Sequence, residues 1–136
     1  MKRDVECLGP QDSVQTAAKK MRDANIGFLP ICDSNDKVLG TLTDRDIVLR
    51  CVADACDAAS KRANELMTRE VVACRPQDDV RRAEELMGKY QKSRILVVDE
   101  EGKLKGVISL SDIADVEEAA RVSDTMRKVV QREVHA

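Results

Sequence analysis

The sequence contains one pattern twice. Residues 28–47, FLPICDSNDKVLGTLTDRDI, align without a gap on residues 94–113, RILVVDEEGKLKGVISLSDI. At the same shift, PQDSVQTAAKKM (10–21) aligns on PQDDVRRAEELM (76–87). Chance does not explain matches at this density, and an internal repeat restricts the fold more than any other feature of a short chain. The chain is therefore a tandem duplication.

Each copy begins with an extended segment and a helix. The extended segment ends at Pro10 or Pro76, and the helix that follows is expected to have Asp12 or Asp78 as its N-cap. In the first copy, the apolar positions of this helix are predicted to be Val14, Ala17, Ala18 and Met21.

Two strands and a closing helix complete each copy. The first strand is predicted at 28–32 and 95–98, and after a polar turn the second strand ends at Thr43 or Ser109. A copy of about 60 residues buries only about 60% of its unfolded surface. We therefore expect an α+β fold in which two β-α-β-β-α repeats pack sheet to sheet about a pseudo-twofold axis.

The segments around the second copy complete the predicted domain organisation. Residues 1–62 are assigned to the first domain with the start of a connector, and 63–136 to the second domain with a C-terminal helix. A short helix is expected in ANELM (63–67). The tail (116–136) has apolar residues at helical spacing, so its helix is expected to close over its own repeat, to form a dimer contact, or both.

Composition argues against several classes of function. The net charge is −2, the basic residues form no run, and Phe28 and Tyr90 are the only aromatic residues, so nucleic acid is not expected as a partner. The chain has no signal-peptide pattern and no apolar run of the roughly 18 residues that span a bilayer. These features predict a cytoplasmic protein without a membrane partner.

The residue pattern also argues against an enzyme or a metal protein. Five cysteines without a C-x-x-C pair are interpreted as reduced, mostly buried thiols. The single histidine, His135, lies near the chain end, so no metal site and no nucleophile–base pair is predicted.

The corner between the second strand and the closing helix has a hydroxyl and a carboxylate at equivalent positions in both copies. Thr43-x-x-Asp46 and Ser109-x-x-Asp112 fit a capping box, in which a hydroxyl and a carboxylate cap the helix start. The same groups could bind a ligand, because helix amides favour phosphate and a carboxylate can accept both hydroxyls of a ribose. The two interpretations are compatible.

The paired motif G-x-Φ-[ST]-x-x-D-Φ, with Φ apolar, resembles that of the cystathionine-β-synthase (CBS) domain pair, or Bateman module. It occurs here as GTLTDRDI (40–47) and GVISLSDI (106–113), and FLPICD and ILVVD resemble the strand that precedes it in that family. The chain is similar to small free-standing bacterial CBS-pair proteins, including the hypoxic-response type.

This resemblance implies regulation by an adenosine derivative such as AMP, ADP, ATP or S-adenosylmethionine, with no other cofactor required. In the family, the motif Asp holds ribose, the Ser or Thr helps with phosphate, and the other copy's strands complete each cleft. Carried over by position, the first site would combine Thr43, Asp44 and Asp46 with Lys92, Ser93 and Arg94. The second would combine Ser109, Ser111 and Asp112 with Ile26, Gly27 and Phe28.

Two functions from different classes therefore stay open. One is an adenine-nucleotide sensor that signals through a homodimer or a protein partner. The other is a ligand-free structural or dimerisation module. A homodimer is expected to bury the apolar side of the closing helices, including Ile47, Val48, Ile113 and Val116.

Overall fold

The computed structural model describes residues 5–114 and 124–130, which form two compact units. One unit spans Glu6–Val71, and the other comprises the second copy from Val72 onward. Each unit has its own hydrophobic core. The expected α+β architecture of two repeats is confirmed, whereas the packing of the repeats about a pseudo-twofold axis stays a prediction.

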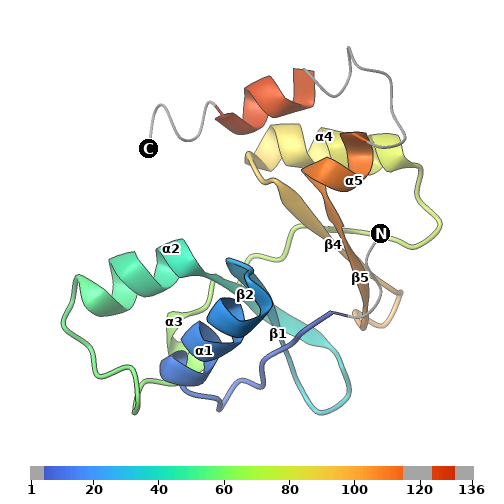
Figure 1. Ribbon diagram of the computed structural model, residues 1–136. Coiled ribbons are helices and arrows are strands. Elements are labelled where there is room, and N and C mark those ends of the chain that lie inside the picture. The colour runs from blue at the N-terminus through green and yellow to red at the C-terminus, as the bar shows by residue number, and fades with distance from the viewer. Residues whose placement is uncertain (1–4, 115–123, 131–136) are drawn as a thin grey trace. The chain divides into compact units, whose positions relative to one another are not determined.

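The first unit contains helices around a two-stranded sheet (Figure 1). Its elements are α1 (Val14–Ala24), β1 (Phe28–Cys32), β2 (Val38–Thr43), α2 (Asp44–Ile47), the π-helix η1 (Val48–Val52) and α3 (Ala63–Leu66). The strands β1 and β2 are antiparallel, and α1 contacts both α2 and α3.

The second unit repeats this order around a three-stranded sheet, β3-β4-β5. Its elements are β3 (Ala73–Cys74), α4 (Val80–Tyr90), β4 (Arg94–Val98), β5 (Leu104–Ser109) and α5 (Leu110–Ala114). Residues 124–130 form a further helical segment. Its Val129 is in the core of this unit, so the described part of the tail packs on its own repeat.

The duplication extends to details of the strand pairing. Phe28 lies opposite Thr43 in the first hairpin, and Arg94 lies opposite Ser109 in the second. Both hairpins have a register shift at the equivalent place, before Cys32 and before Val98. The predicted strands are therefore confirmed, and the second copy's first strand begins one residue earlier than expected.

The N-caps of α1 and α4 differ from the expected residues. Ser13 and Asp79 cap these helices, each one residue after the predicted Asp12 and Asp78. The reason is that Asp12 and Asp78 accept hydrogen bonds from backbone amides three residues earlier, and so close the preceding turn. The next side-chain oxygen along the chain is then the one placed to accept an amide of the first turn.

The buried face of α1 is narrower than predicted. Val14, Ala17 and Met21 are buried, but Ala18 is exposed. These three buried positions follow the i, i+3, i+7 spacing of one stripe, and Ala18 lies beside that stripe. The predicted short connector helix is confirmed as α3, and its Ala63 and Leu66 belong to the core of the first unit.

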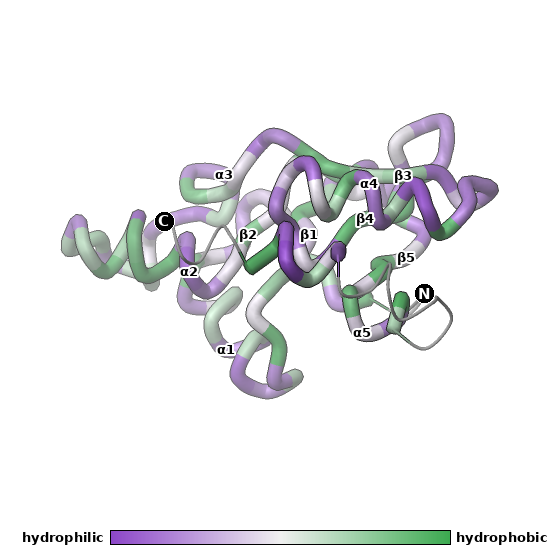
Figure 2. The backbone as a smooth tube through the Cα atoms, turned by 90° about the horizontal axis from the view of Figure 1, so that it is seen from above, coloured by the Kyte–Doolittle hydropathy of each residue, from purple (hydrophilic) through white to green (hydrophobic). Residues whose placement is uncertain are grey.

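The predicted exposed apolar face of the closing helices is confirmed at Val48 and wrong at Ile113. Ile113 is fully buried in the second core, and Ile47 packs against the first core. Val116 lies outside the described residues. Beside Val48, the first closing helix also exposes Leu49 and Val52, and Figure 2 shows η1 as mostly hydrophobic. Among the described residues, no helix has the length and apolar character needed to cross a bilayer.

Candidate functional site

The first corner is a complete capping box at the junction of β2 and α2. The Asp46 amide donates to Thr43 Oγ1 at 3.0 Å, and the Thr43 amide donates to Asp46 Oδ2 at 2.9 Å. Asp44 Oδ1 accepts the Arg45 amide at 2.8 Å. The capping prediction is confirmed here, and it leaves Asp46 Oδ1 as the carboxylate oxygen outside the box.

The second corner has the same geometry at the junction of β5 and α5. The Ser109 amide donates to Asp112 Oδ2 at 2.8 Å, and the Asp112 amide donates to Ser109 Oγ at 3.2 Å. The Ser109 and Ser111 hydroxyls lie 2.8 Å apart and share a hydrogen bond. This corner therefore presents two hydroxyls, whereas the first presents one hydroxyl and a second carboxylate.

Arg50 is a further residue of the first corner, and the motif did not indicate it. Its Nη2 lies 3.6 Å from Asp46 Oδ1, one helical turn away, in an ion pair with a side chain that is only 15% exposed. Arg50 Nη1 also donates to the Leu66 carbonyl at 2.9 Å and to Thr68 Oγ1. The i, i+4 spacing was the available signal. Valine occupies the equivalent position in the second copy, at 116.

Each corner also contacts the segment that precedes the first strand of its own repeat. The Asp44 amide donates to the Gly27 carbonyl at 3.0 Å, and the Leu110 amide donates to the Ser93 carbonyl at 2.8 Å. A Cβ on Gly27 would lie 2.8 Å from Asp44 Oδ2, so this carboxylate lies against Gly27.

Residues 26–28 and 92–94, which were predicted to complete the cleft of the other repeat, lie next to the corner of their own repeat. Ile26, Gly27 and Phe28 lie in the unit of Thr43, and Lys92, Ser93 and Arg94 in that of Ser109. Lys92 and Arg94 are exposed, whereas Ile26 and Phe28 are half-buried. The pairing of each set with the corner of the other repeat concerns the relation between the units and stays a prediction.

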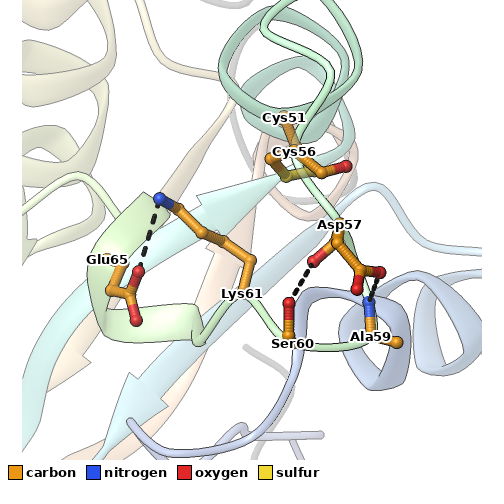
Figure 3. The surroundings of a disulfide bond; sticks show 7 residues. All are labelled: Cys51, Cys56, Asp57, Ala59, Ser60, Lys61 and Glu65. Carbon is orange, nitrogen blue, oxygen red and sulfur yellow. Dashed lines mark hydrogen bonds and ion pairs between the residues drawn. A yellow bond between two sulfur atoms is a disulfide. The ribbon is translucent and has the colours of Figure 1, made fainter.

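The cysteines are not all reduced, which corrects the sequence interpretation. Cys51 and Cys56 form a disulfide across the turn that follows η1 (Figure 3). Because only four residues lie between them, the turn brings the two side chains together. Cys32 and Cys74 are buried and Cys7 is half-buried, and these three are outside the disulfide.

The described residues offer no metal centre. Within 5–114 and 124–130, no three His, Cys, Asp or Glu side chains come together in a way that could hold a metal ion. His135 lies outside these ranges.

The repeats and their corners define a pair of CBS domains, and the chain belongs to the CBS domain family. The profile of that family matches residues 1–52 and 63–119. A relative is hypoxic response protein 1 of Mycobacterium tuberculosis, 33% identical over 114 residues that cover 84% of this chain and 79% of that protein. Its crystal structure, described with two coordinated zinc ions, has a TM-score of 0.77 and covers 85% of this chain and 93% of its own.

Two other relatives show the range of proteins that carry this domain pair. The CBS domain pair of protein MJ0100, solved with 5′-methylthioadenosine and S-adenosyl-L-methionine, is 30% identical with a TM-score of 0.69, covering 81% of this chain and 86% of its own. Inosine-5′-monophosphate dehydrogenase of Methanocaldococcus jannaschii is 33% identical over 82% of this chain but only 21% of the enzyme. The chain is therefore a regulatory CBS-pair module, and its likeness to the enzyme is confined to a part of it.

Proposed function

We propose that this CBS pair binds an adenosine derivative at its two corners and signals the binding of this ligand through a homodimer or a protein partner. The observation that carries the proposal is the pair of matched corners, each with a motif carboxylate and hydroxyl. The carboxylates of Asp46 and Asp112 would accept the ribose hydroxyls, as the resemblance to the family implies.

The geometry of the corners suits this role for the carboxylate. Asp46 Oδ2 accepts one amide, and Oδ1 lies in an ion pair with Arg50 and outside the capping box. A carboxylate can accept several hydrogen bonds, so a ribose diol can bind at Oδ1 while the capping bond at Oδ2 persists. Arg50 Nη2 lies 3.6 Å from Asp46 Oδ1, longer than a hydrogen bond, so this oxygen can still accept from a diol.

The choice of ligand class is supported by a relative. Both molecules bound to the CBS pair of protein MJ0100 contain an adenosine group. Adenosine is therefore the part of the ligand that we propose for this chain, with AMP, ADP, ATP and S-adenosylmethionine as the candidates.

The alternative function is a ligand-free structural or dimerisation module. It is favoured by the fact that both corners already satisfy their own amides. Exposed Val48, Leu49 and Val52 provide an apolar surface for a second copy.

A thermal-shift panel of AMP, ADP, ATP, S-adenosylmethionine and NAD tests the proposed function. A ligand at 100 times its dissociation constant stabilises the folded protein by about 2.7 kcal/mol, which raises Tm by several degrees. Inosine at the same concentrations is the control for the adenine base. A flat panel at millimolar concentrations would rule out the sensor and leave the structural module.

The two corners are expected to bind phosphate unequally. We propose that Arg94 serves the corner of the other repeat, where Asp46 lies. The Asp112→Asn change should disable the second corner, so that AMP binds only at the first. In this background, Arg94→Ala should weaken AMP binding by about 10- to 100-fold, because it removes a charge-assisted contact. Calorimetric titration measures this.

The reciprocal background identifies the corner that Arg94 serves. With Asp46→Asn in place, Arg94→Ala should leave the remaining AMP binding unchanged. Arg81→Ala, which removes an exposed cation of α4, should have no effect in either background. If Arg94→Ala weakens binding only in the Asp46→Asn background, Arg94 serves its own repeat and the assignment is wrong.

A further inference from the structure

Two cysteines from distant parts of the first repeat lie side by side. Cys7 precedes α1 and Cys32 ends β1, yet the Cys32 thiol donates to Cys7 Sγ at 3.9 Å. The backbone holds them together. The Leu8 amide donates to the Pro30 carbonyl at 3.0 Å, and the Cys32 amide donates to the Leu8 carbonyl at 2.9 Å. The two thiols are therefore neighbours on adjacent parallel segments, at the separation of paired strands.

The surroundings shift the pKa values of the two thiols in opposite directions. The hydrogen bond from Cys32 lowers the pKa of Cys7, against the burial of Cys7 and the nearby charges of Asp36 and Glu6, and Lys20 lowers it further. The same hydrogen bond and burial raise the pKa of Cys32, with Asp36 and Asp33 acting in the same direction. Because the thiolate is the nucleophile, this difference in pKa favours Cys7 over Cys32 as the attacking thiol.

The second repeat shows that the fold does not require these thiols. The positions equivalent to Cys7 and Cys32 are Ala73 and Val98. Ala73 begins β3, which pairs in parallel with β4. In the same way, Leu8 in the first repeat forms a parallel bridge to Ile31 of β1. Small apolar residues are thus sufficient at both positions, and the paired cysteines are a property of the first repeat alone.

We propose that Cys7 and Cys32 form a reversible thiol–disulfide site that reacts with small disulfides such as oxidised glutathione. The Cys7 thiolate attacks one sulfur of the oxidised glutathione, and one glutathione thiolate leaves. The Cys32 thiol then loses its proton to solvent and attacks the Cys7 sulfur of the mixed disulfide. The second glutathione leaves, and the protein dithiol has been oxidised by two electrons while one disulfide of glutathione has been reduced to two thiols.

The product would link the chain start to β1 in the repeat that carries the Thr43–Asp46 corner. It is separate from the Cys51–Cys56 disulfide, which joins residues of one turn. The site does not depend on adenosine binding, so its test is independent of the proposed function.

Tryptic mapping of the oxidised protein tests the site, because each relevant cysteine falls in a different peptide. Cys7 lies in 4–19, Cys32 in 23–37 and Cys74 in 70–81, while 51–61 contains both Cys51 and Cys56. The reduced protein is incubated with oxidised glutathione, the remaining thiols are alkylated, and the digest is analysed by mass. We expect peptides 4–19 and 23–37 joined by a disulfide, and peptide 70–81 alkylated, since burial raises the pKa of the Cys74 thiol.

Single variants separate the two roles. In Cys32→Ser, whose hydroxyl can still donate to Cys7 Sγ, peptide 4–19 should carry a stable glutathione adduct, because no thiol resolves it. In Cys7→Ala, peptide 23–37 should be alkylated and without glutathione. Cys74→Ala should form the joined peptides as the wild type does.

The double variant Cys7→Ala/Cys32→Val is the fold control and should melt like the reduced wild type. A stable adduct on peptide 4–19 of the wild type, without the joined peptides, would overturn the proposal. So would a Cys32→Ser protein whose Cys7 does not react.

Discussion

Asp46→Asn and Asp112→Asn together are expected to abolish most of the stabilisation that an adenosine ligand gives, while changing the unliganded protein little. An asparagine side-chain oxygen can still accept the Thr43 or Ser109 amide, so the capping bond persists. It cannot accept both ribose hydroxyls as a carboxylate does. If the ligand then binds about 100-fold more weakly, a concentration that stabilised the wild type by about 2.7 kcal/mol stabilises the variant by only about 0.4 kcal/mol.

Thermal unfolding with and without ligand measures both quantities in one experiment. Asp54→Asn is the matched control, because it removes one carboxylate charge from an exposed position of the first repeat outside the corner. The control should keep the full ligand-induced shift in Tm. If the double variant loses the same stability with ligand as without it, the carboxylates only cap their helices and the structural module is favoured.

Gly40→Ala is expected to destabilise the first repeat by about 2 kcal/mol. A Cβ at Gly40 would lie 2.6 Å from the Thr68 carbonyl oxygen and 2.8 Å from Met67 Sδ. Thr68 exchanges two backbone hydrogen bonds with Thr41, at 3.0 and 2.9 Å, so its carbonyl can move only if this bridge opens. Overpacking of this kind costs about 1–3 kcal/mol, and the lower entropy of the unfolded chain offsets only about 0.4–1 kcal/mol.

Gly9→Ala provides the comparison in the same repeat. The nearest atom to a Cβ at Gly9 is Asp12 Oδ2 at 3.6 Å, an ordinary contact. We expect Gly9→Ala to melt within a degree or two of the wild type and Gly40→Ala several degrees lower. Equal melting temperatures for the two variants would contradict the close approach at Gly40 and show that the 67–68 segment moves aside without cost.

Gly40, the glycine of the first motif, thus leaves room for a neighbouring segment, and its position in a strand does not predict this contact. From the sequence, Gly40 is one residue of a predicted strand. Only the tertiary structure shows that the segment after α3, residues 67–68, pairs with β2 at this point.

Local features were predictable because each sequence pattern that indicates them occurs in both copies of the repeat. The hairpins, their turns and the capping boxes each occur at two equivalent places, and each depends on residues within a few positions along the chain. Asp33 and Asp99 show this well, since each closes its hairpin turn by accepting two amides two and four residues on. Hydrogen-bonding of this range follows from residue type and spacing.

The choice between neighbouring candidates was less predictable. Asp12 and Ser13 can both cap α1, and the backbone path before the helix decides that Asp12 bonds Gly9 instead. In the same way, Ala18 and Ile113 are apolar residues at helical spacing, yet one is exposed and the other fully buried. A hydrophobic pattern gives the face of a helix, but the shape of the opposing core determines how wide the buried stripe is.

By itself, the sequence determined that this chain is a duplicated α+β protein with a capped hydroxyl–carboxylate corner in each copy. The tertiary structure alone decided which distant side chains meet. It paired Cys7 with Cys32, placed Arg50 between Asp46 and the Leu66 carbonyl, and set Thr68 against Gly40. The physical reason is that these contacts join residues 16 to 28 positions apart or depend on how such segments pack, and no local periodicity or propensity encodes the distance between two segments that the fold brings together.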